Sequence, residues 1–133
     1  MLKISTKGRY GLRVMAQLAK HYGEGPMLLS EISKLEDISL KYAEHLIRRL
    51  KPTKLLNSYR GANGGYELSK PPEKIVVRQI VEALEGKDYP VECLHDPDVC
   101  DRTEICAARM VWEKLEKAMV ETLENITLDQ LVD

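Results

Sequence analysis

Residues 39–68 constrain the fold of this chain more than any other stretch. In the first half, apolar side chains recur at the three- and four-residue spacing that places them on one face of a short helix: Leu40, Ala43, Leu46, Ile47 and Leu50. Ser39 stands where an N-cap hydroxyl would accept from the first free amides. Lys51-Pro52 should end the helix, because proline disfavours helical geometry at the residue before it.

The second half of this stretch predicts a β-hairpin. Two strand-like runs, 55–60 and 66–68, flank Gly61-Ala62-Asn63-Gly64-Gly65. Asn-Gly and Gly-Gly supply the positive φ angles that a tight hairpin turn requires. A polar helix followed by a basic hairpin is typical of a winged helix-turn-helix. In that fold the helix enters the major groove of DNA and the hairpin lies along the backbone or the minor groove.

The residues before position 39 supply the remaining helices. Ser5 or Thr6 is placed to cap a first helix that runs to about Tyr22. Ser30 is expected to cap a second, and 36–38 form a turn of the usual helix-turn-helix length. The inward positions of the second helix are expected to be Leu29, Ile32 and Leu35.

Two sets of polar residues are candidates for DNA contact. The face of the 39–50 helix opposite its apolar stripe carries Lys41, Tyr42, Glu44, His45, Arg48 and Arg49. The start of the first helix carries Lys3, Lys7, Arg9 and Arg13. Cations at a helix N-terminus oppose the helix dipole, which makes sense if that end faces phosphates. On these residues alone, a solvated helix face and an ordinary turn explain the pattern equally well.

The charge distribution favours the DNA interpretation. Residues 1–70 hold 13 Lys and Arg against 6 Asp and Glu, a balance of +7, whereas residues 71–133 hold 7 against 15, a balance of −8. A basic module of this size suits a phosphate backbone, which would repel the acidic half. We therefore expect a DNA-binding domain over 1–70 and a separate functional region over 71–133.

The acidic half contains two predicted helices. Val77, Ile80, Val81 and Leu84 mark a short core helix that Gly86 closes. Apolar periodicity returns over 108–126 and predicts a helix of roughly 30 Å. Such a helix is too long to decorate a small domain, so we expect a dimerisation helix with Trp112 as an anchor. The alternative is a helix that covers its own domain.

Three cysteines, Cys93, Cys100 and Cys106, have the spacing C-x6-C-x5-C. This spacing matches neither a zinc ribbon nor a redox C-x-x-C pair, but it suits an iron–sulfur cluster. Three free reduced thiols would look the same. The pattern lacks a fourth ligand, for which a residue of a partner subunit or one of these neighbours could serve: His95, Asp96, Asp98, Asp101 and Glu104.

The odd number of cysteines also bears on the compartment. No apolar run approaches the roughly 18 residues of a membrane span, and the N-terminus shows no signal-peptide pattern. Clustered cysteines in a chain without export signals indicate a reducing cytoplasm. We expect a cytoplasmic protein without membrane contact.

The chain resembles the Rrf2 family of bacterial winged-helix regulators. The residues that carry the resemblance are 4–12 (ISTKGRYGL), 58–66 (SYRGANGGY), 81–86 (VEALEG), the three cysteines and 125–128 (NITL). The family includes iron–sulfur cluster assembly regulators, nitric-oxide-sensing repressors and cysteine-metabolism repressors. The resemblance implies a mainly α fold with a small β-hairpin wing, and a homodimer on a pseudo-palindromic DNA operator with a cluster loop near the dimer interface.

The resemblance also implies roles for individual residues. Ser39, Lys41, Tyr42 and His45 would face the major groove, and Arg60 would reach a minor groove, where the negative potential favours Arg. Glu44 could accept from cytosine N4 and so set sequence choice. The expected DNA-contacting set is Ser39, Lys41, Tyr42, Glu44, His45, Arg48, Arg60, Gly61, Lys7 and Arg9.

Departures from the family pattern concern the cluster and the wing. Arg109 stands where the cluster assembly regulators carry a ligating His, and Arg9 stands where the nitric-oxide sensors carry a ligating Asp. Lys54 replaces the Gly that usually precedes the wing. The N-terminal half looks closest to the cysteine-metabolism repressors, which lack the cysteines.

The sequence therefore predicts a transcriptional regulator whose DNA binding is controlled by an iron–sulfur cluster, with 2Fe-2S favoured over 4Fe-4S. The alternative is a cluster-free regulator of the cysteine-metabolism type, controlled by thiol oxidation or by a protein partner docking on the acidic half. An enzyme or electron-transfer protein is disfavoured, because no nucleophile–base pair or phosphate loop is visible and the basic half would go unexplained.

Overall fold

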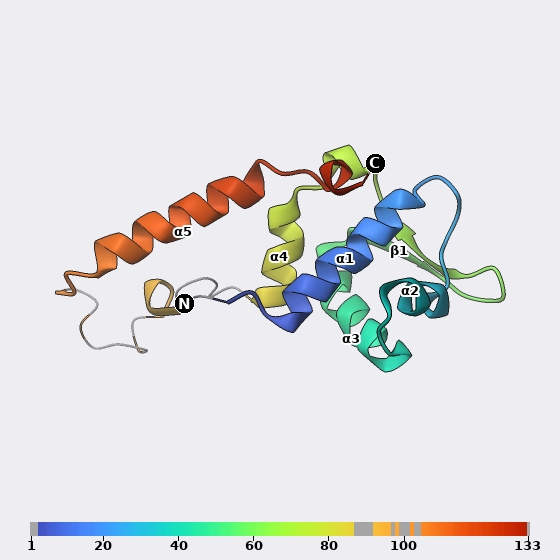
Figure 1. Cartoon of the computed structure of the whole chain (residues 1–133), viewed down its shortest axis with the longest axis horizontal. Coiled ribbons are helices and arrows are strands. Elements are labelled where there is room, and N and C mark those ends of the chain that lie inside the picture. Colours follow the sequence, from blue (N-terminus) through green and yellow to red (C-terminus); the bar gives the residue numbers. More distant parts are fainter. Residues whose placement is uncertain (1–2, 87–91, 97, 99–101, 103–104, 133) are drawn as a thin grey trace.

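A computed structural model describes residues 3–86, 92–96, 98, 102 and 105–132 (Figure 1). The chain is mostly helical with one two-stranded antiparallel hairpin, as the sequence predicted. The helices and strands are α1 (Thr6–Lys20), α2 (Leu29–Glu36), α3 (Leu40–Leu50), β1 (Leu56–Tyr59), β2 (Gly65–Leu68), α4 (Val77–Glu85) and α5 (Arg109–Glu124). Short 3-10 turns are η1 (Lys51–Thr53), η2 (Pro72–Lys74), η3 (Glu92–Leu94) and η4 (Leu128–Leu131).

The helix-turn-helix forms with one difference from the prediction in α2. This helix begins at Leu29 with no side-chain cap, so Ser30 lies within its first turn and is not the N-cap. Leu35 is 54% exposed, contrary to the prediction, whereas Ile32 is fully buried. The turn after α2 uses a left-handed residue, Asp37, with φ 52°. The buried residues of α2 are Ile32 and Glu36, one helical turn apart, and Leu35 lies on the side of Ile32 away from Glu36.

Helix α3 forms as predicted. The Ser39 hydroxyl accepts from the Tyr42 amide at 3.0 Å and caps the helix. The helix ends at Leu50, directly before the turn that contains Pro52. The side chains that face the core are Ala43, Leu46, Ile47 and Leu50, while Leu40 at the first turn stays exposed. This burial fixes which face of α3 remains outside.

The wing pairs β1 with β2 in the register Leu56↔Leu68 to Tyr59↔Gly65. Positive φ angles occur at Gly61 (95°) and Gly65 (129°), not at Asn63-Gly64. A side chain at Gly65 would also place its Cβ 2.0 Å from the Met27 carbonyl oxygen. Met27 and Tyr66 exchange two backbone hydrogen bonds of 2.8 Å, which attach the chain before α2 to the start of β2.

Helix α4 packs against both α1 and α3 and completes their common hydrophobic core. The end of the chain returns to the same core. Leu128 is fully buried, and its amide donates to the Ile75 carbonyl at 2.9 Å, while the Val77 amide donates to Ile126 at 2.9 Å. These contacts place the C-terminal end of α5 beside the start of α4.

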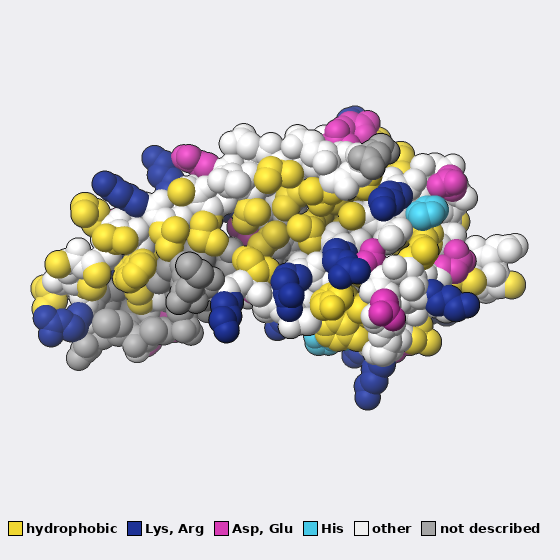
Figure 2. All heavy atoms as spheres, in the orientation of Figure 1, with side chains coloured by type: hydrophobic (Ala, Val, Ile, Leu, Met, Phe, Trp, Pro, Cys, Tyr) yellow, Lys and Arg dark blue, Asp and Glu magenta, His cyan; other side chains and the backbone are white. Residues whose placement is uncertain are grey.

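Helix α5 projects from this body as an arm (Figure 1). None of its residues is buried. In Figure 2, apolar side chains run along the arm and continue toward the body. Among the residues that the structure describes, no helix is long and apolar enough to cross a membrane.

Candidate nucleic-acid interface

The polar face of α3 carries a shallow hollow of about 370 Å³, lined by Ser39, Lys41, Tyr42, His45 and Arg48. Lys41, Glu44 and Arg48 are exposed, and Tyr42 and His45 are half-buried. The helical spacing of these residues places cations at both ends of the hollow and a carboxylate beside it. The structure thus brings six of the predicted DNA-contacting residues together on one surface.

Tyr42 plays a different part from its neighbours, because its hydroxyl is buried and makes no hydrogen bond within the described residues. Its ring packs edge-on against Tyr10 of α1, with centroids 6.1 Å apart at 86°, and lies nearly parallel to His45 at 6.1 Å and 23°. Burial raises the pKa of Tyr42, and the nearby Tyr10 raises it further. The Tyr42 ring thus contacts Tyr10 of α1 on one side and His45 of α3 on the other.

An ion pair between a half-exposed arginine, Arg13, and a buried glutamate, Glu36, lies next to this aromatic stack. The Nε of Arg13 donates to the Glu36 carboxylate at 2.8 Å, and its Nη2 reaches the Glu36 carbonyl at 3.4 Å. Glu36 is only 7% exposed, whereas the guanidinium lies 5.0 Å from the Tyr10 ring centroid. Arg13, grouped by sequence with the candidate phosphate-binding cations, therefore joins α1 to the end of α2.

Sequence reasoning missed Glu36 and Tyr10 as parts of this arrangement. Tyr10 lies on α1 and meets Tyr42 of α3, so no local spacing relates the two. A glutamate in the last turn of a helix is ordinarily solvated, and only its burial shows that it needs the Arg13 partner.

The first turns of α1 lie beside the α3 face. Arg9 is exposed, and its guanidinium lies 6.0 Å from the centroid of the Tyr10 ring. Lys7, in the same part of α1, is half-buried. Because Tyr10 touches Tyr42, Arg9 extends the basic surface of α3 onto α1. Figure 2 shows Lys and Arg side chains along the lower edge of the view, over α1 to α3.

The wing presents Arg60 and Gly61 at its tip, and both are exposed. Next to the tip, the Tyr59 hydroxyl donates to the Glu67 carboxylate across the strands at 2.7 Å, and this hydrogen bond raises the pKa of Tyr59. The pair fixes the end of β1 next to Arg60. Gly64 is buried in the turn, where an added Cβ would lie 2.5 Å from the Tyr59 carbonyl oxygen.

The cysteine-bearing segment contacts the start of α5. Cys93 and Cys106 are half-buried free thiols, and Cys100 lies outside the described residues. Nη1 of Arg109, three residues after Cys106, donates to the Cys93 carbonyl at 3.4 Å. His95 Nε2 lies 2.5 Å from the Glu116 carboxylate of α5. Both contacts hold the 92–96 turn against α5.

This arrangement bears on a cluster in two ways. It brings the Cys93 and Cys106 turns to the same end of α5, and thiolates are the ligands that iron–sulfur clusters use. Within the described residues, no group of three or more metal-ligating side chains is present. Arg109 and His95 are engaged in other contacts. Two of the candidate fourth ligands, Asp101 and Glu104, lie outside the described residues, as does Cys100.

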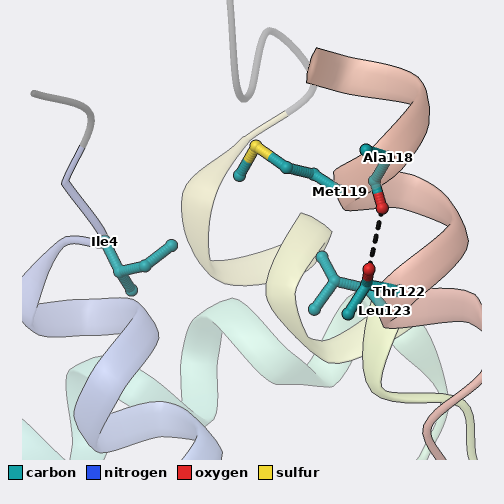
Figure 3. Close-up of a pocket in the computed structure, with 5 residues that line it drawn as sticks. All are labelled: Ile4, Ala118, Met119, Thr122 and Leu123. Carbon is teal, nitrogen blue, oxygen red and sulfur yellow. Dashed lines mark hydrogen bonds between the residues drawn. The ribbon is translucent and has the colours of Figure 1, made fainter. Parts of the chain in front are cut away.

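The inner side of α5 forms an apolar groove of about 340 Å³ with the N-terminal segment, lined by Ile4, Ala118, Met119, Thr122 and Leu123 (Figure 3). The Thr122 hydroxyl donates to the Ala118 carbonyl at 2.8 Å, so the polar group of this side chain already has a hydrogen-bond partner within α5. Nearer the cysteines, Met110, Val111 and Trp112 are exposed large side chains.

A helix-turn-helix with an exposed polar reading helix and a hairpin wing defines a winged-helix transcriptional regulator rather than an enzyme. The chain belongs to the Rrf2 family, because the model of that family, described as iron-dependent transcriptional regulators, matches residues 4–133.

Solved structures and sequence relatives agree with this assignment. CymR, the global cysteine regulator of B. subtilis, superposes with a TM-score of 0.81 at 44% identity, over 98% of this chain and 96% of that one. IscR of T. potens superposes with a TM-score of 0.77 at 40% identity, over 96% and 83%. The protein rrf2 of Nitratidesulfovibrio vulgaris is 38% identical over 131 residues, which cover 98% of this chain and 87% of the relative.

Proposed function

We propose that this protein is a homodimeric regulator that reads a DNA operator with α3 and the wing, and whose cysteines control that reading. The observation that carries the proposal is the hollow on α3, because its rim combines Lys41, His45 and Arg48 on an exposed helical face. A helix with this polar surface fits the width of the major groove.

The proposed contacts divide into two kinds. In the major groove, donors to base edges or phosphates come from Lys41, His45 and Arg48, and Glu44 can accept from cytosine N4. Ser39, the N-cap of α3, would face the sugar-phosphate backbone of the DNA. Lys7 and Arg9 of α1 would meet phosphates. At the wing tip, Arg60 would enter a minor groove, and Gly61 would let the backbone approach closely.

Binding to DNA can be tested by titrating a labelled duplex, selected by the protein from a randomised library, at several salt concentrations. Affinity should fall steeply with salt, because each neutralised phosphate releases a counterion. A protein that showed no salt-dependent binding to any duplex at low ionic strength would refute the proposed function.

The exposed apolar face of α5 supports dimerisation. Trp112 and Met110 are exposed at one end of the helix, and the groove beside Met119 continues the apolar surface at the other. A helix with this much exposed apolar surface requires a partner, and a second α5 offers the same chemistry. Sedimentation equilibrium should give twice the mass of 15.2 kDa, and Trp112→Ala should weaken the dimer. A monomer at micromolar concentration would contradict this role of α5.

For control by the cysteines, two candidates have support. Cys93, Cys100 and Cys106 could hold an iron–sulfur cluster, with 2Fe-2S favoured, and IscR of T. potens is a close structural relative. When bound, the cluster would supply a crosslink between the thiolates that oxidation or ligand exchange can break. The cluster-free alternative has support from CymR of B. subtilis, whose structure superposes best among the relatives described above. There the thiols, or a protein partner on the acidic half, would supply the signal.

Purification without air separates the two candidates. A cluster gives broad visible absorption with stoichiometric iron and sulfide, and Cys93→Ser or Cys106→Ser should abolish both. Colourless, iron-free protein that still binds DNA would support the cluster-free alternative. In either case the control would act by population shift, through the spacing of two reading heads that successive major grooves hold at roughly 34 Å. Such a regulator would work in the cytoplasm, where thiols stay reduced.

A further inference from the structure

The last turn of α4 is attached to the start of α1 by a carboxylate. Glu85 accepts hydrogen bonds from the Ser5 amide at 3.1 Å and from the Ser5 hydroxyl at 2.6 Å. The same hydroxyl accepts from the Gly8 amide at 3.2 Å. A side chain 80 residues away in the sequence thus completes the N-cap of α1.

The charge of Glu85 matters at this position. The first turn of α1 contains no acidic residue of its own, and Lys7 and Arg9 add positive charge there. A helix N-terminus favours an anion, so the carboxylate from α4 supplies the negative charge that α1 lacks. Its hydrogen bonds are charge-assisted and therefore stronger than those of a neutral cap.

Two glycines of α1 allow the close approach. A Cβ at Gly8 would lie 2.2 Å from the Glu85 Oε1 atom, and a Cβ at Gly11 would lie 2.5 Å from the Leu84 Cδ1 atom. Any residue larger than glycine at these positions would therefore push the Glu85 carboxylate or the Leu84 side chain out of its place. The two glycines therefore let the side chains of the last turn of α4 pack directly against the backbone of α1.

The same turn of α4 also contacts the reading helix. Arg49 of α3 donates from Nη2 to the Leu84 carbonyl at 3.3 Å, and its Nε is buried without a partner in the described part of the chain. Arg49 is adjacent in sequence to Arg48, which lines the hollow on the outer face. One turn of α4 thus contacts both α1 and α3, the two helices with DNA-facing residues.

That turn is also where the cysteine-bearing segment begins. Helix α4 ends at Gly86 with φ 97°, and Cys93 follows seven residues later. We propose that Glu85 is a positioning residue that transmits the chemical state of the cysteines to α1 and α3, an inference that rests on the proposed function. If a change at the cysteines moves the end of α4, the Glu85–Ser5 hydrogen bonds break, α1 loses its cap charge, and Arg49 loses the Leu84 carbonyl. The two cysteine states would thereby favour different positions of α1 against α3.

The test compares DNA affinity in two states of the cysteines. The probe is a fluorescein-labelled duplex that the wild-type protein selects from a randomised library. Its Kd is measured for protein purified without air and for the same protein after treatment with an iron chelator and iodoacetamide. In the wild type we expect the treatment to change Kd at least about fivefold, the lower end of typical coupling. In Glu85→Gln the two Kd values should agree within about twofold.

Glu82→Gln is the matched control. Glu82 lies on the same helix, but it is exposed and pairs with Arg78 of α4 at 2.7 Å instead of with Ser5. This variant should keep the wild-type response to the treatment. A Glu85→Gln protein that also kept the wild-type response would overturn the inference while leaving the proposed function intact.

A second measurement needs no DNA, and it tests the inference even if the Glu85→Gln protein folds poorly. Amide hydrogen exchange over residues 6–11 should accelerate in the wild type after the treatment, because the cap of α1 is lost. Ser5→Ala, which retains the carboxylate but removes its hydroxyl partner, should exchange fast in both states. Unchanged wild-type exchange in this segment, or a full response in Ser5→Ala, would overturn the inference. Wild-type protein that binds the duplex but ignores the treatment would refute cysteine control itself.

Discussion

Arg13 offers a direct test of how this structure distributes its cations. It lies among the basic residues at the start of α1, yet its guanidinium donates to Glu36 at 2.8 Å. The Glu36 side chain is 8% exposed and the Arg13 side chain 54% exposed. Replacing Arg13 with Ala would leave a buried carboxylate without its main donor and remove the cation above the Tyr10 ring.

The structure sets the expected magnitude. Breaking a fully buried ion pair costs about 3–5 kcal/mol, because the remaining charge is desolvated and unpaired. Water can reach the Arg13 side of this pair, so we expect Arg13→Ala to lower the free energy of unfolding by about 2–3 kcal/mol. Replacing both members with apolar residues, Arg13→Met with Glu36→Leu, should recover most of this loss, since no buried charge then remains.

Two measurements on the same variant separate a structural role from a DNA-contacting one. Urea unfolding gives the stability, and the dependence of log Kd on log salt counts the phosphate contacts. Arg13→Ala should be destabilised with an unchanged salt slope. Arg9→Ala is the matched control, because Arg9 is exposed on the same helix. It should keep the wild-type stability, and its slope of log Kd against log salt should be smaller by about one, the value for one phosphate contact.

The opposite pattern would refute this account. If Arg13→Ala unfolded at the wild-type urea concentration and lowered the salt slope by about one, Arg13 would bind phosphate, and the contact with Glu36 would contribute little. A double variant as unstable as Arg13→Ala would show that side-chain packing, not the unpaired carboxylate, accounts for the loss.

Three further predictions concern the reading helix and the wing. Arg60→Ala should weaken binding to the selected duplex by about 1–3 kcal/mol, and unchanged affinity would remove Arg60 from the reading set. Gly65→Ala should lower the free energy of unfolding in urea by about 2–4 kcal/mol, because φ at Gly65 is 129° and the new Cβ would collide with the Met27 carbonyl. A variant as stable as the wild type would contradict this geometry. Tyr42→Phe should be as stable as the wild type or more so at neutral pH, since the lost hydroxyl is buried without a partner. Because the folded-state pKa of Tyr42 is raised, the unfolded state releases the phenol proton at lower pH than the folded state does. The free energy of unfolding of the wild type should therefore fall as pH rises above about 10, and that of Tyr42→Phe should fall less. Equal falls in the two proteins would argue against the burial of this hydroxyl.

Local patterns in the sequence were sufficient for α3 and the hairpin. The apolar spacing, the Ser39 cap and Pro52 act within a few residues of one another, and the helix runs from Leu40 to Leu50 as they predict. The hairpin also formed where the glycines lie, but its positive φ angles occur at Gly61 and Gly65. Gly65 is also where Met27 pairs with the start of β2, and a Cβ there would collide with the Met27 carbonyl, which local sequence could not show.

Burial in α2 could not be predicted in the same way. Periodicity placed Leu35 with Ile32 on one inward stripe, but α2 has only 8 residues and ends in a left-handed turn. Its inward face is centred on Ile32 and Glu36, so Leu35 lies at the edge of that face and its side chain remains in solvent. A short helix buries too narrow a stripe for spacing alone to define its edges.

The sequence by itself determined the helix-turn-helix, the wing and the charge difference between the two halves, because these depend on residues near one another in the chain. Only the tertiary structure decided which polar groups serve the fold. Glu36 with Arg13, Tyr42 with Tyr10 and Glu85 with Ser5 are pairs between different elements. Spacing assigns a residue to a face of its helix, but the partner that meets that face depends on how the helices pack, and this decides whether a cation is free for DNA or already paired.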